Sequence, residues 1–294
     1  MRTRLLHRLA TVGMTVILGG FLAATLVRYA PGFGVDEREL DSRFTRETIR
    51  RLREEAAAGG QGIVSYYVHY MARILRGDLG VSAGFRRPVA ALIAERLPET
   101  VRSAGAGLAC GWAAGMFLAL AGVTVARPGF DFLTGAAAAL LLCIPTAVMA
   151  FAFVLAGTLE TGAAATIVIS LVILPRVFRY ARSLLGRVAT APHVFMALAR
   201  GNGRFRLVWV HVLRPAWPSL VALLAVSVSM ALGAAIPVEV ICDSPGLGHL
   251  AWQAALKRDL PLLIDITLLI SVVTGVSGFA AELAQTRTAK GDSL

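Results

Sequence analysis

The chain has 294 residues, of which 56% are hydrophobic and only 16% are charged. Soluble domains usually have about 25% charged residues, so this composition excludes an ordinary soluble protein and favours a chain embedded in a membrane. The formal net charge is +11, yet the polar block 31–100 contains eleven arginines and ten acidic residues and is nearly neutral. The excess positive charge therefore lies beside apolar segments, which argues against a nucleic-acid-binding protein.

The first apolar segment, residues 9–28, follows three arginines. It is longer than the roughly 7–15 apolar residues of a secretory signal, so we interpret it as an uncleaved first membrane span. The polar residues 31–100 are predicted to form a large outer loop that contains two helices, at 43–60 and 62–77. The second helix has an apolar face, which suits either a membrane surface or packing against neighbouring elements.

Five further apolar segments are long enough for helices that cross the hydrocarbon core, which takes about 20 residues. These segments are 101–126, 131–157, 162–181, 216–240 and 262–284. They are rich in Gly, Ala and Ser, which allows helix backbones to approach closely in lipid. The sequence therefore predicts an all-α transmembrane fold, a six-helix bundle with a large, partly helical outer loop. Its expected parts are an N-terminal segment and first span at 1–30, the outer loop at 31–100, the other spans at 101–285 with an inner loop at about 186–215, and a tail at 286–294.

The distribution of basic residues predicts the orientation. If the N-terminus lies inside, the inner segments carry fourteen Arg and Lys residues, whereas the short outer loops carry only Lys257 and Arg258. The long loop 31–100 is exempt from this count. Both termini are therefore predicted to be cytoplasmic.

The stretch ALARGNGRFRLVWVHVLRP, residues 197–215, would then also be cytoplasmic, and it contains no acidic residue. Anionic lipid would attract its basic residues but does not explain the pattern within it. A short apolar-faced helix is predicted to begin at Pro192 and to end at Gly201 and Gly203. A helix of this kind, lying across the inner ends of a bundle, is suited to bind a soluble partner.

Within this stretch, Ala197, Leu198 and Ala199, followed after three residues by Gly203, resemble the E-A-A-x-x-x-G pattern. That pattern belongs to permease subunits of binding-protein-dependent ABC transporters, in which the loop forms a coupling helix that sits in a cleft of the ATPase subunit. The resemblance implies an ATPase-coupling loop that includes Phe195, Ala197, Leu198, Ala199, Arg200 and Gly203.

Four other motifs are similar to the dipeptide/oligopeptide/nickel permease family and follow that family's order. APGF at 30–33 resembles A-P-G-D, GDLGVS at 77–82 matches G-D-L-G-x-S, and IAERLPET at 93–100 resembles R-L-P-x-T. Residues 238–263 are similar to V-E-x-V-F-x-x-P-G-L-G followed by R-D-x-P. The resemblance implies an outer vestibule, at which a substrate-binding protein docks, with the motif residues Gly77, Asp78, Leu79, Gly80, Glu239, Pro245, Gly246, Leu247 and Gly248.

The chain departs from the family pattern in several places. Ala197 replaces the first Glu of E-A-A, and His193 and Val194 replace the acid expected just before it. The segment after Gly203 is slightly short, and the link TLETG at 158–162 is much shorter than in relatives. These departures leave open a specialised half of a heterodimer, a degraded member of the family, or altered contacts with the ATPase and the binding protein.

Two acidic residues and one turn at the edges of the spans are further candidates. Glu239 and Asp265 could either reach water or take part in a pathway, because buried charge is costly in hydrocarbon. Ser244–Gly248 is predicted to form a tight turn that leads the outer loop back towards the bundle. Pro145, Pro175 and Pro237 are expected to kink their helices.

No pattern indicates catalysis or metal binding by this chain. It has no G-x-x-x-x-G-K-[ST] phosphate loop and no H-E-x-x-H motif, so ATP and Mg²⁺ would be bound by partner ATPase subunits. We therefore predict a transport subunit that is not itself an enzyme and that binds no cofactor.

The resemblance implies the permease subunit of an ABC importer, which forms a pathway for peptides or related small solutes, nickel complexes included. Its expected partners are a second, related permease, two ATPase subunits, an extracytoplasmic substrate-binding protein and membrane lipid. A secondary transporter is an alternative, although we find no inverted repeat. A membrane scaffold or regulator without transport, and an intramembrane enzyme, also remain open.

Overall fold

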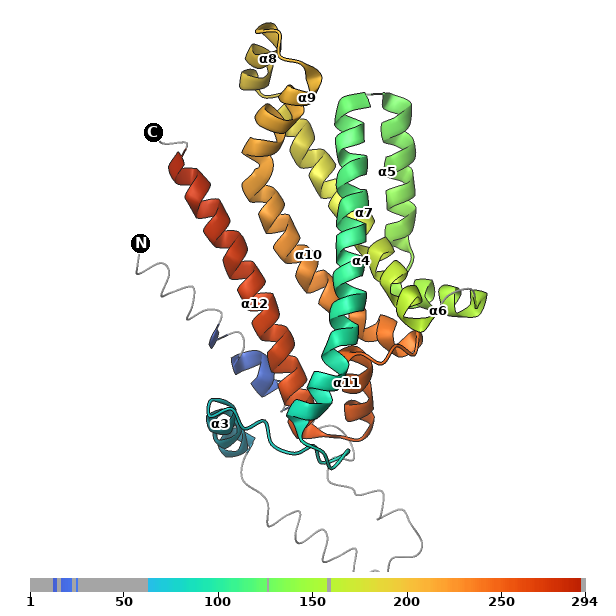
Figure 1. Cartoon of the computed structure of the whole chain (residues 1–294), viewed down its shortest axis with the longest axis vertical. Helices are drawn as coiled ribbons and strands as arrows, with labels where there is room; N and C mark the ends of the chain where they lie inside the picture. Colours follow the sequence, from blue (N-terminus) through green and yellow to red (C-terminus); the bar gives the residue numbers. More distant parts are fainter. Residues whose placement is uncertain are drawn as a thin grey trace, which may run out of the picture. The chain divides into compact units, whose positions relative to one another are not determined.

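The computed structural model describes residues 13–14, 17–22, 25, 63–125, 127–157 and 160–291. The chain forms two compact units (Figure 1). In the described part, unit 1 consists of Glu95–Trp252 and the chain from Val272 onwards, and unit 2 consists of the chain up to Ala94 together with Gln253–Ser271.

Nearly all regular structure in the described residues is helical, which confirms the all-α prediction. The helices are α3 (Ile63–Ile74), α4 (Val89–Val125), α5 (Pro128–Cys143), α6 (Thr146–Ala156), α7 (Thr161–Ala189), α8 (Pro192–Ala199), α9 (Arg204–Arg206), the π-helix η2 (Leu207–Leu213), α10 (Arg214–Ile241), α11 (Leu247–Leu256) and α12 (Leu260–Gly291). An isolated bridge between Val81 and Pro88 is the exception within this part. The helix predicted at 43–60 and most of the first span lie outside the described residues.

Four stretches of helix in the described part are long and apolar enough to cross a membrane. They are α4, α7, the continuous η2–α10 stretch Leu207–Ile241, and Leu260–Leu283 of α12. Each contains most or all of a span predicted from the sequence. The bounds differ, however, because α4 begins well before residue 101 and α7 continues to Ala189. The stretch between α7 and η2 comprises Thr190–Arg206.

The span predicted at 131–157, with an interruption at Pro145, corresponds to a broken pair of helices. The structure has two helices there, α5 and α6, which are bent by 91° at a short break. Ile144 is extended, and Pro145 follows it as the N-cap residue of α6. Proline has no backbone N–H and disfavours the helical conformation of the residue before it, so the helix breaks here. Pro175 and Pro237, in contrast, lie inside the continuous helices α7 and α10.

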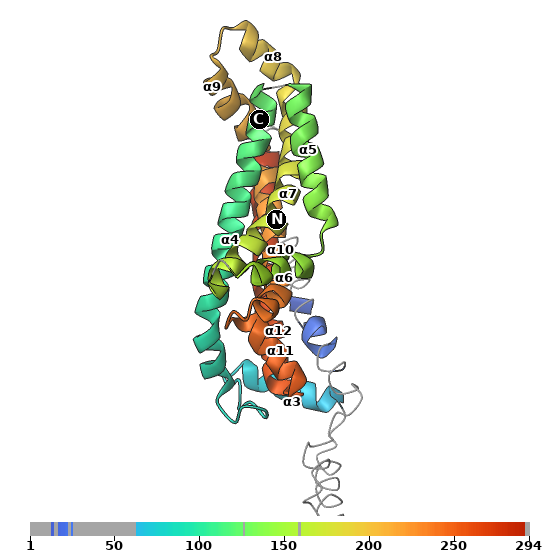
Figure 2. The same ribbon diagram turned by 90° about the vertical axis from the view of Figure 1, so that its right-hand side faces the viewer.

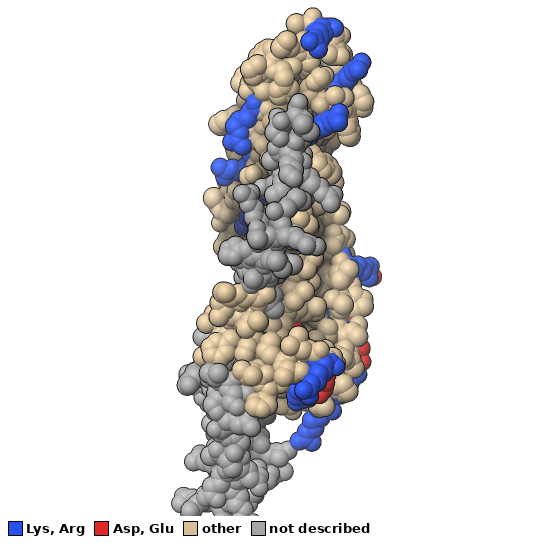
Figure 3. All heavy atoms as spheres, turned by 90° about the vertical axis from the view of Figure 1, so that its left-hand side faces the viewer, with Lys and Arg blue, Asp and Glu red and all other residues tan. Residues whose placement is uncertain are grey.

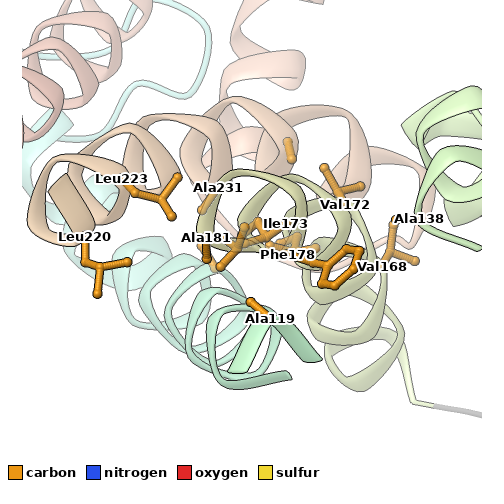
Figure 4. Packing of buried hydrophobic residues seen from close by; sticks show 14 of the residues in the cluster. Ala119, Ala138, Val168, Val172, Ile173, Phe178, Ala181, Leu220, Leu223 and Ala231 are labelled. Atoms are coloured by element: carbon orange, nitrogen blue, oxygen red, sulfur yellow. The ribbon is translucent and has the colours of Figure 1, made fainter. Parts of the chain in front are cut away.

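Helix α7 is the centre of the unit 1 core. Helices α5, α6 and α10 pack against it (Figures 1 and 2). Figure 4 shows the α7 side chains Val172, Ile173 and Phe178 beside side chains from α4, α5 and α10. These α7 residues recur at helical spacing, so one wide face of the helix is apolar and buried.

Helix α4 contacts α7 through a row of glycines. A Cβ atom on Gly107, Gly111 or Gly115 would lie within 3.0 Å of α7 atoms, including the backbone carbonyl oxygens of Ser170 and Leu174. The four-residue spacing puts the three glycines on one face of α4. This small-residue face allows the close backbone approach that stabilises helix pairs in lipid.

In unit 2, α3 packs against the beginning of α12. Tyr67 and Tyr70 are buried among apolar residues that include Leu260 and Ile264. The Tyr70 hydroxyl donates a hydrogen bond of 2.9 Å to the carbonyl oxygen of Pro261. The structure therefore shows packing against neighbouring elements, which is one of the two interpretations that the sequence allowed for this helix.

Candidate functional site

The first candidate surface is the α8 segment, which we define as Thr190–Arg206. Within α8, Val194 and Ala197 are buried and fix one face of the helix against unit 1. Phe195, Met196 and Leu198 are 60%, 59% and 54% exposed. A short helix anchored by small residues thus presents its large apolar side chains to the surroundings.

A complete C-terminal cap ends α8. The Gly201 N–H donates to the Leu198 carbonyl at 2.9 Å, and the Asn202 N–H donates to the Ala197 carbonyl at 3.3 Å. Gly201 has φ +76°, so this is a Schellman motif, in which glycine suits the left-handed position. The Asn202 side chain adds a bond of 2.9 Å to the same Ala197 carbonyl. Gly201 is therefore the terminating glycine. Gly203 was predicted to share this role, but its φ is not positive. Its Cβ position has no neighbouring atom within 4 Å.

The α8 segment is attached to two candidate spans. Its first residue directly follows the end of α7, and α8 packs against η2, which continues into α10. His193 Nε2 also lies 3.0 Å from the carbonyl oxygen of His211 in η2. A π-helix alters the carbonyl ladder of an α-helix and frequently occurs at functional sites. A force on α8 would thus act on α7 and α10.

The surface of the α8 segment combines positive charge with aromatic rings. Arg200 and Arg206 are exposed, and the segment contains no acidic residue. The exposed ring of Phe205 lies next to the exposed ring of Trp209 in the adjoining η2, with centroids 5.9 Å apart. On the face drawn in Figure 3, Lys and Arg are visible at the α8 end without Asp or Glu.

The second candidate is the Glu239 turn, which we define as Glu239–Gly248. Helix α10 ends at Ile241, and α11 begins at Leu247. The Ser244 N–H donates to the Glu239 carbonyl at 2.9 Å, and the Gly246 N–H donates to the Ser244 carbonyl at 2.8 Å. The tight turn predicted at Ser244–Gly248 is present at Ser244–Gly246, while Leu247 and Gly248 already belong to α11.

The Glu239 side chain organises this turn from inside. It is fully buried, and its carboxylate accepts hydrogen bonds from the Gly248 N–H at 2.7 Å and from the Ser103 hydroxyl at 3.4 Å. A Cβ on Gly246 would collide with this carboxylate, and a Cβ on Gly248 would lie 2.6 Å from Cα of Ile236. Glu239 thus faces protein. It does not reach water at the edge of its span, although that was one of the two possibilities considered from the sequence.

Helix α4 clamps the turn from the other side. Thr100 Oγ1 accepts a hydrogen bond of 2.7 Å from the Leu247 N–H, and the Ser244 hydroxyl donates one of 3.2 Å to Glu99. Sequence reasoning quoted the motif 93–100 but assigned no role to Thr100. Its signal was present, since a Thr next to Glu99 at the edge of a span calls for a hydrogen-bond partner.

The GDLG motif lies in unit 2 and forms a separate loop. Asp78 makes a 2.8 Å ion pair with Arg73 and accepts a 2.8 Å hydrogen bond from the Gly80 N–H. These contacts lower the pKa of the Asp78 carboxyl, with the Arg73 hydrogen bond as the largest cause. Gly77 and Gly80 have φ of +81° and +75°, which explains the two glycines. Leu79 lies between Asp78 and Gly80. The structure thus brings Glu239 and the PGLG residues together in unit 1 and places GDLG in unit 2.

Sequence reasoning also missed Asp259, which organises the next part of unit 2. The Ser82 hydroxyl donates to the buried Asp259 carboxylate, which also accepts from the Gly84 N–H at 3.0 Å and the Leu262 N–H at 3.3 Å. One carboxylate therefore closes the loop after GDLG and caps the start of α12. The R-D-x-P pattern contained this residue, but only the fold reveals its partners.

In the described residues, no group of His, Cys, Asp and Glu is arranged to hold a metal ion. The two surfaces in unit 1 are instead one exposed helix and one closed, hydrogen-bonded turn.

A family model for binding-protein-dependent transport system inner membrane components matches residues 107–291. This match covers more than half of the chain, and the chain belongs to that family. The match contains α8, both partners of the α4–α7 glycine contact, and the whole Glu239 turn.

Curated relatives match over two thirds or more of the chain. A probable peptide ABC transporter permease protein of Sinorhizobium fredii is 23% identical over 310 aligned positions, which cover 96% of each chain. A putative peptide permease protein of Brucella suis is 25% identical over 305 positions and 95% of each chain. A glutathione transport system permease protein of Salmonella choleraesuis is 30% identical over 225 positions, which cover 69% of this chain and 71% of the relative.

The chain is thus the permease subunit of an ABC importer, an inner-membrane transport component and not an enzyme. Membership of this family implies ATPase and binding-protein partners. The predicted class of protein is therefore confirmed.

Proposed function

We propose that the chain and a second, related permease form a pathway for peptides or similar small solutes. A substrate-binding protein delivers the cargo from outside the cell, and two ATPase subunits bind ATP and Mg²⁺ on the cytoplasmic side. The names of the relatives from Sinorhizobium and Brucella support peptides as the cargo class, whereas none of the relatives described above is named for nickel.

The observation that carries this proposal is the exposed apolar face of α8. Phe195, Met196 and Leu198 are uncovered, while the opposite face of the helix is firmly packed. Apolar side chains of this size gain free energy when they are buried, at about 1.5–3 kcal/mol each. A groove on an ATPase subunit would supply that burial, as other grooves do for amphipathic helices.

In this proposal the α8 segment is a lever between the ATPase and the spans. Closure of the ATPase pair on ATP moves α8, and its connections move α7 and α10. Only a difference in binding free energy between two states can shift the permease from one state to the other. The ATPase must therefore bind α8 differently in its open and closed forms.

The other end of α10 has the opposite role in the proposal. With both termini in the cytoplasm, the Glu239 turn and the GDLG loop lie on the outer side, where the binding protein docks. The turn's internal hydrogen bonds support a rigid rim, because its backbone needs no further partner to hold its shape.

The experiment compares Leu198→Glu with Leu198→Met in proteoliposomes that contain the complete transporter. The glutamate places a charge in the proposed contact, so we expect at least about a tenfold fall in uptake per ATP hydrolysed. The methionine keeps the surface apolar and of similar volume, so uptake should stay close to wild type.

Unchanged coupling in Leu198→Glu would contradict the lever. If the wild-type complex hydrolyses ATP and binds its partners but moves no peptide from a mixed library, the chain is a membrane scaffold or its cargo is of another class. A second library of non-peptide solutes separates those two results.

A further inference from the structure

A hollow of about 440 Å³ opens between α5 and α7 in unit 1. Its charged lining residues are Arg179, Arg182, Arg187 and Asp131, and Phe178 and Gly135 add apolar surface. Its volume lies in the range of about 300–1,000 Å³ that is typical of small-ligand sites. Nothing in the proposed transport cycle uses these residues.

One arginine in the hollow is fixed by protein contacts. Arg182 makes a two-pronged ion pair with Asp131, with Nη2–Oδ2 at 2.7 Å and Nε–Oδ1 at 3.1 Å. Gly122 and Gly186 lie against the Arg182 guanidinium, and a Cβ on either would come within 3.1 Å of it. Asp131 therefore balances Arg182 and is not available to the other two arginines.

Arg179 and Arg187 remain as positive charges without an acidic partner in the described part of the chain. Both are exposed, and Arg187 has a 3.4 Å contact with the Ser183 hydroxyl. Their spacing around Ser183 places them on one face of α7, on the same side of the hollow. Guanidinium groups without an acidic partner are suited to bind phosphate oxygens through charge-assisted hydrogen bonds.

The surroundings of the hollow favour a ligand that is anionic at one end and apolar at the other. Helix α5, which forms one wall, exposes Phe132 and Leu133, and further along Leu140. These exposed side chains and the apolar composition of α5 suit contact with lipid tails. Basic pockets between transmembrane helices are suitable sites for anionic headgroups.

We propose that this hollow binds the phosphate headgroup of an anionic phospholipid. Arg179 and Arg187 contact the phosphate, while the acyl chains lie along the apolar surface of α5. The proposal is independent of the cargo and of the α8 lever, because none of its residues belongs to either.

The test is a titration of the intact transporter complex in detergent with phosphatidylglycerol, with bound lipid counted by native mass spectrometry. Each basic residue near a membrane surface contributes roughly 1 kcal/mol, so we expect Arg179→Gln to weaken binding about fivefold. The double variant Arg179→Gln/Arg187→Gln should weaken it further. Arg127→Gln removes an exposed arginine that does not line the hollow and should leave binding unchanged.

A further variant, Ser183→Glu, tests the same site if the double variant does not assemble. Ser183→Glu keeps both arginines and places a carboxylate in the hollow, so it should also weaken phosphatidylglycerol binding. Phosphatidylcholine with the same acyl chains should bind more weakly than phosphatidylglycerol to the wild-type complex.

Three results would overturn the proposal. Equal binding of phosphatidylglycerol by wild type and by the arginine variants would exclude the hollow as the site. Displacement of the lipid by an equal concentration of inorganic phosphate would make it a site for soluble anions. A disulfide or maleimide cross-link from Ser183→Cys to the second permease would show that protein occupies it.

Discussion

The α8 segment and the Glu239 turn both belong to unit 1, but they differ in which groups are buried and which are exposed. In the Glu239 turn, the buried carboxylate accepts hydrogen bonds from the Gly248 N–H and the Ser103 hydroxyl, and Thr100 accepts one from the Leu247 N–H. In the α8 segment the backbone cap is complete, but the large apolar side chains are exposed. The buried polar groups of the turn are thus hydrogen-bonded within the chain. In α8 the backbone is hydrogen-bonded at its end, but the large apolar side chains are not buried.

This difference indicates that the Glu239 turn is a structural element and that α8 is a contact surface. A turn that satisfies its own buried groups holds one shape, and its substitution should cost stability. Exposed apolar patches mark interaction sites in proteins that are otherwise packed. Substitutions on α8 should therefore cost function and leave stability nearly unchanged.

The largest expected effect comes from Gly248, the glycine of the turn whose Cβ would meet backbone atoms. Gly248→Ala places a Cβ 2.6 Å from the backbone Cα of Ile236, which cannot move without a shift of α10. We expect a loss of about 3 kcal/mol in the free energy of unfolding, measured by denaturation of the detergent-purified chain. The matched control is Gly233→Ala, whose Cβ has no neighbour within 4 Å and which should be neutral or slightly stabilising. Equal stability of the two variants would contradict the close packing of the turn.

The next effect concerns the buried carboxylate. Glu239→Ala leaves the Gly248 N–H without its acceptor, and a buried unsatisfied donor costs about 2 kcal/mol. Glu239→Gln keeps an acceptor oxygen and a similar volume, so its loss of unfolding free energy should be clearly smaller. If alanine and glutamine are equally destabilising, the negative charge and not the hydrogen bond holds the turn.

The third prediction concerns α8, where a substitution should change the free energy of unfolding only slightly. Leu198→Glu changes an exposed residue, so the free energy of unfolding should change by no more than about 0.5 kcal/mol. The same denaturation assay serves here, with Val194→Glu as the control, because Val194 is buried on the other face of α8. A large loss of stability in Leu198→Glu would mean that α8 packs within the chain more than its exposure indicates.

The smallest effect belongs to the exposed pair in unit 2. The lowered pKa of Asp78 means that its ion pair with Arg73 stabilises the fold above the ordinary aspartate pKa of about 3.9, and that this stabilisation is lost as the pH falls through the lowered value. Wild type should therefore be slightly more stable than Asp78→Asn at pH 7. The two should converge in acid when unfolding is followed across pH. A gap that widens towards acid pH would reverse the sign of this linkage.

The sequence was informative where one local property determines the structure. Apolar length located the helices α4, α7, α10 and α12, and the Ser244–Gly248 composition predicted a turn. Pro145 was expected to bend a helix, yet the resulting 91° break exceeded a kink. How far a proline turns the chain depends on the neighbouring helices, which residue types alone do not specify.

The sequence was less informative where two distant segments meet. Glu239 was open to a role at the water interface, because a carboxylate at the edge of a span can reach water. Its burial depends on Ser103 and Thr100 of α4, which are far away in the chain. The choice of Gly201 over Gly203 as the terminating residue of α8 likewise depends on backbone conformation, since either glycine could adopt a positive φ.

The most direct measurement of the central claim asks which side of the membrane α8 faces. In a variant with Cys110, Cys143 and Cys242 replaced, Phe195→Cys carries a single exposed thiol in the apolar face of α8. A membrane-impermeant maleimide should label it in inside-out vesicles, and added ATPase subunits should protect it. Labelling from outside intact cells, or no protection by the ATPase, would contradict the account.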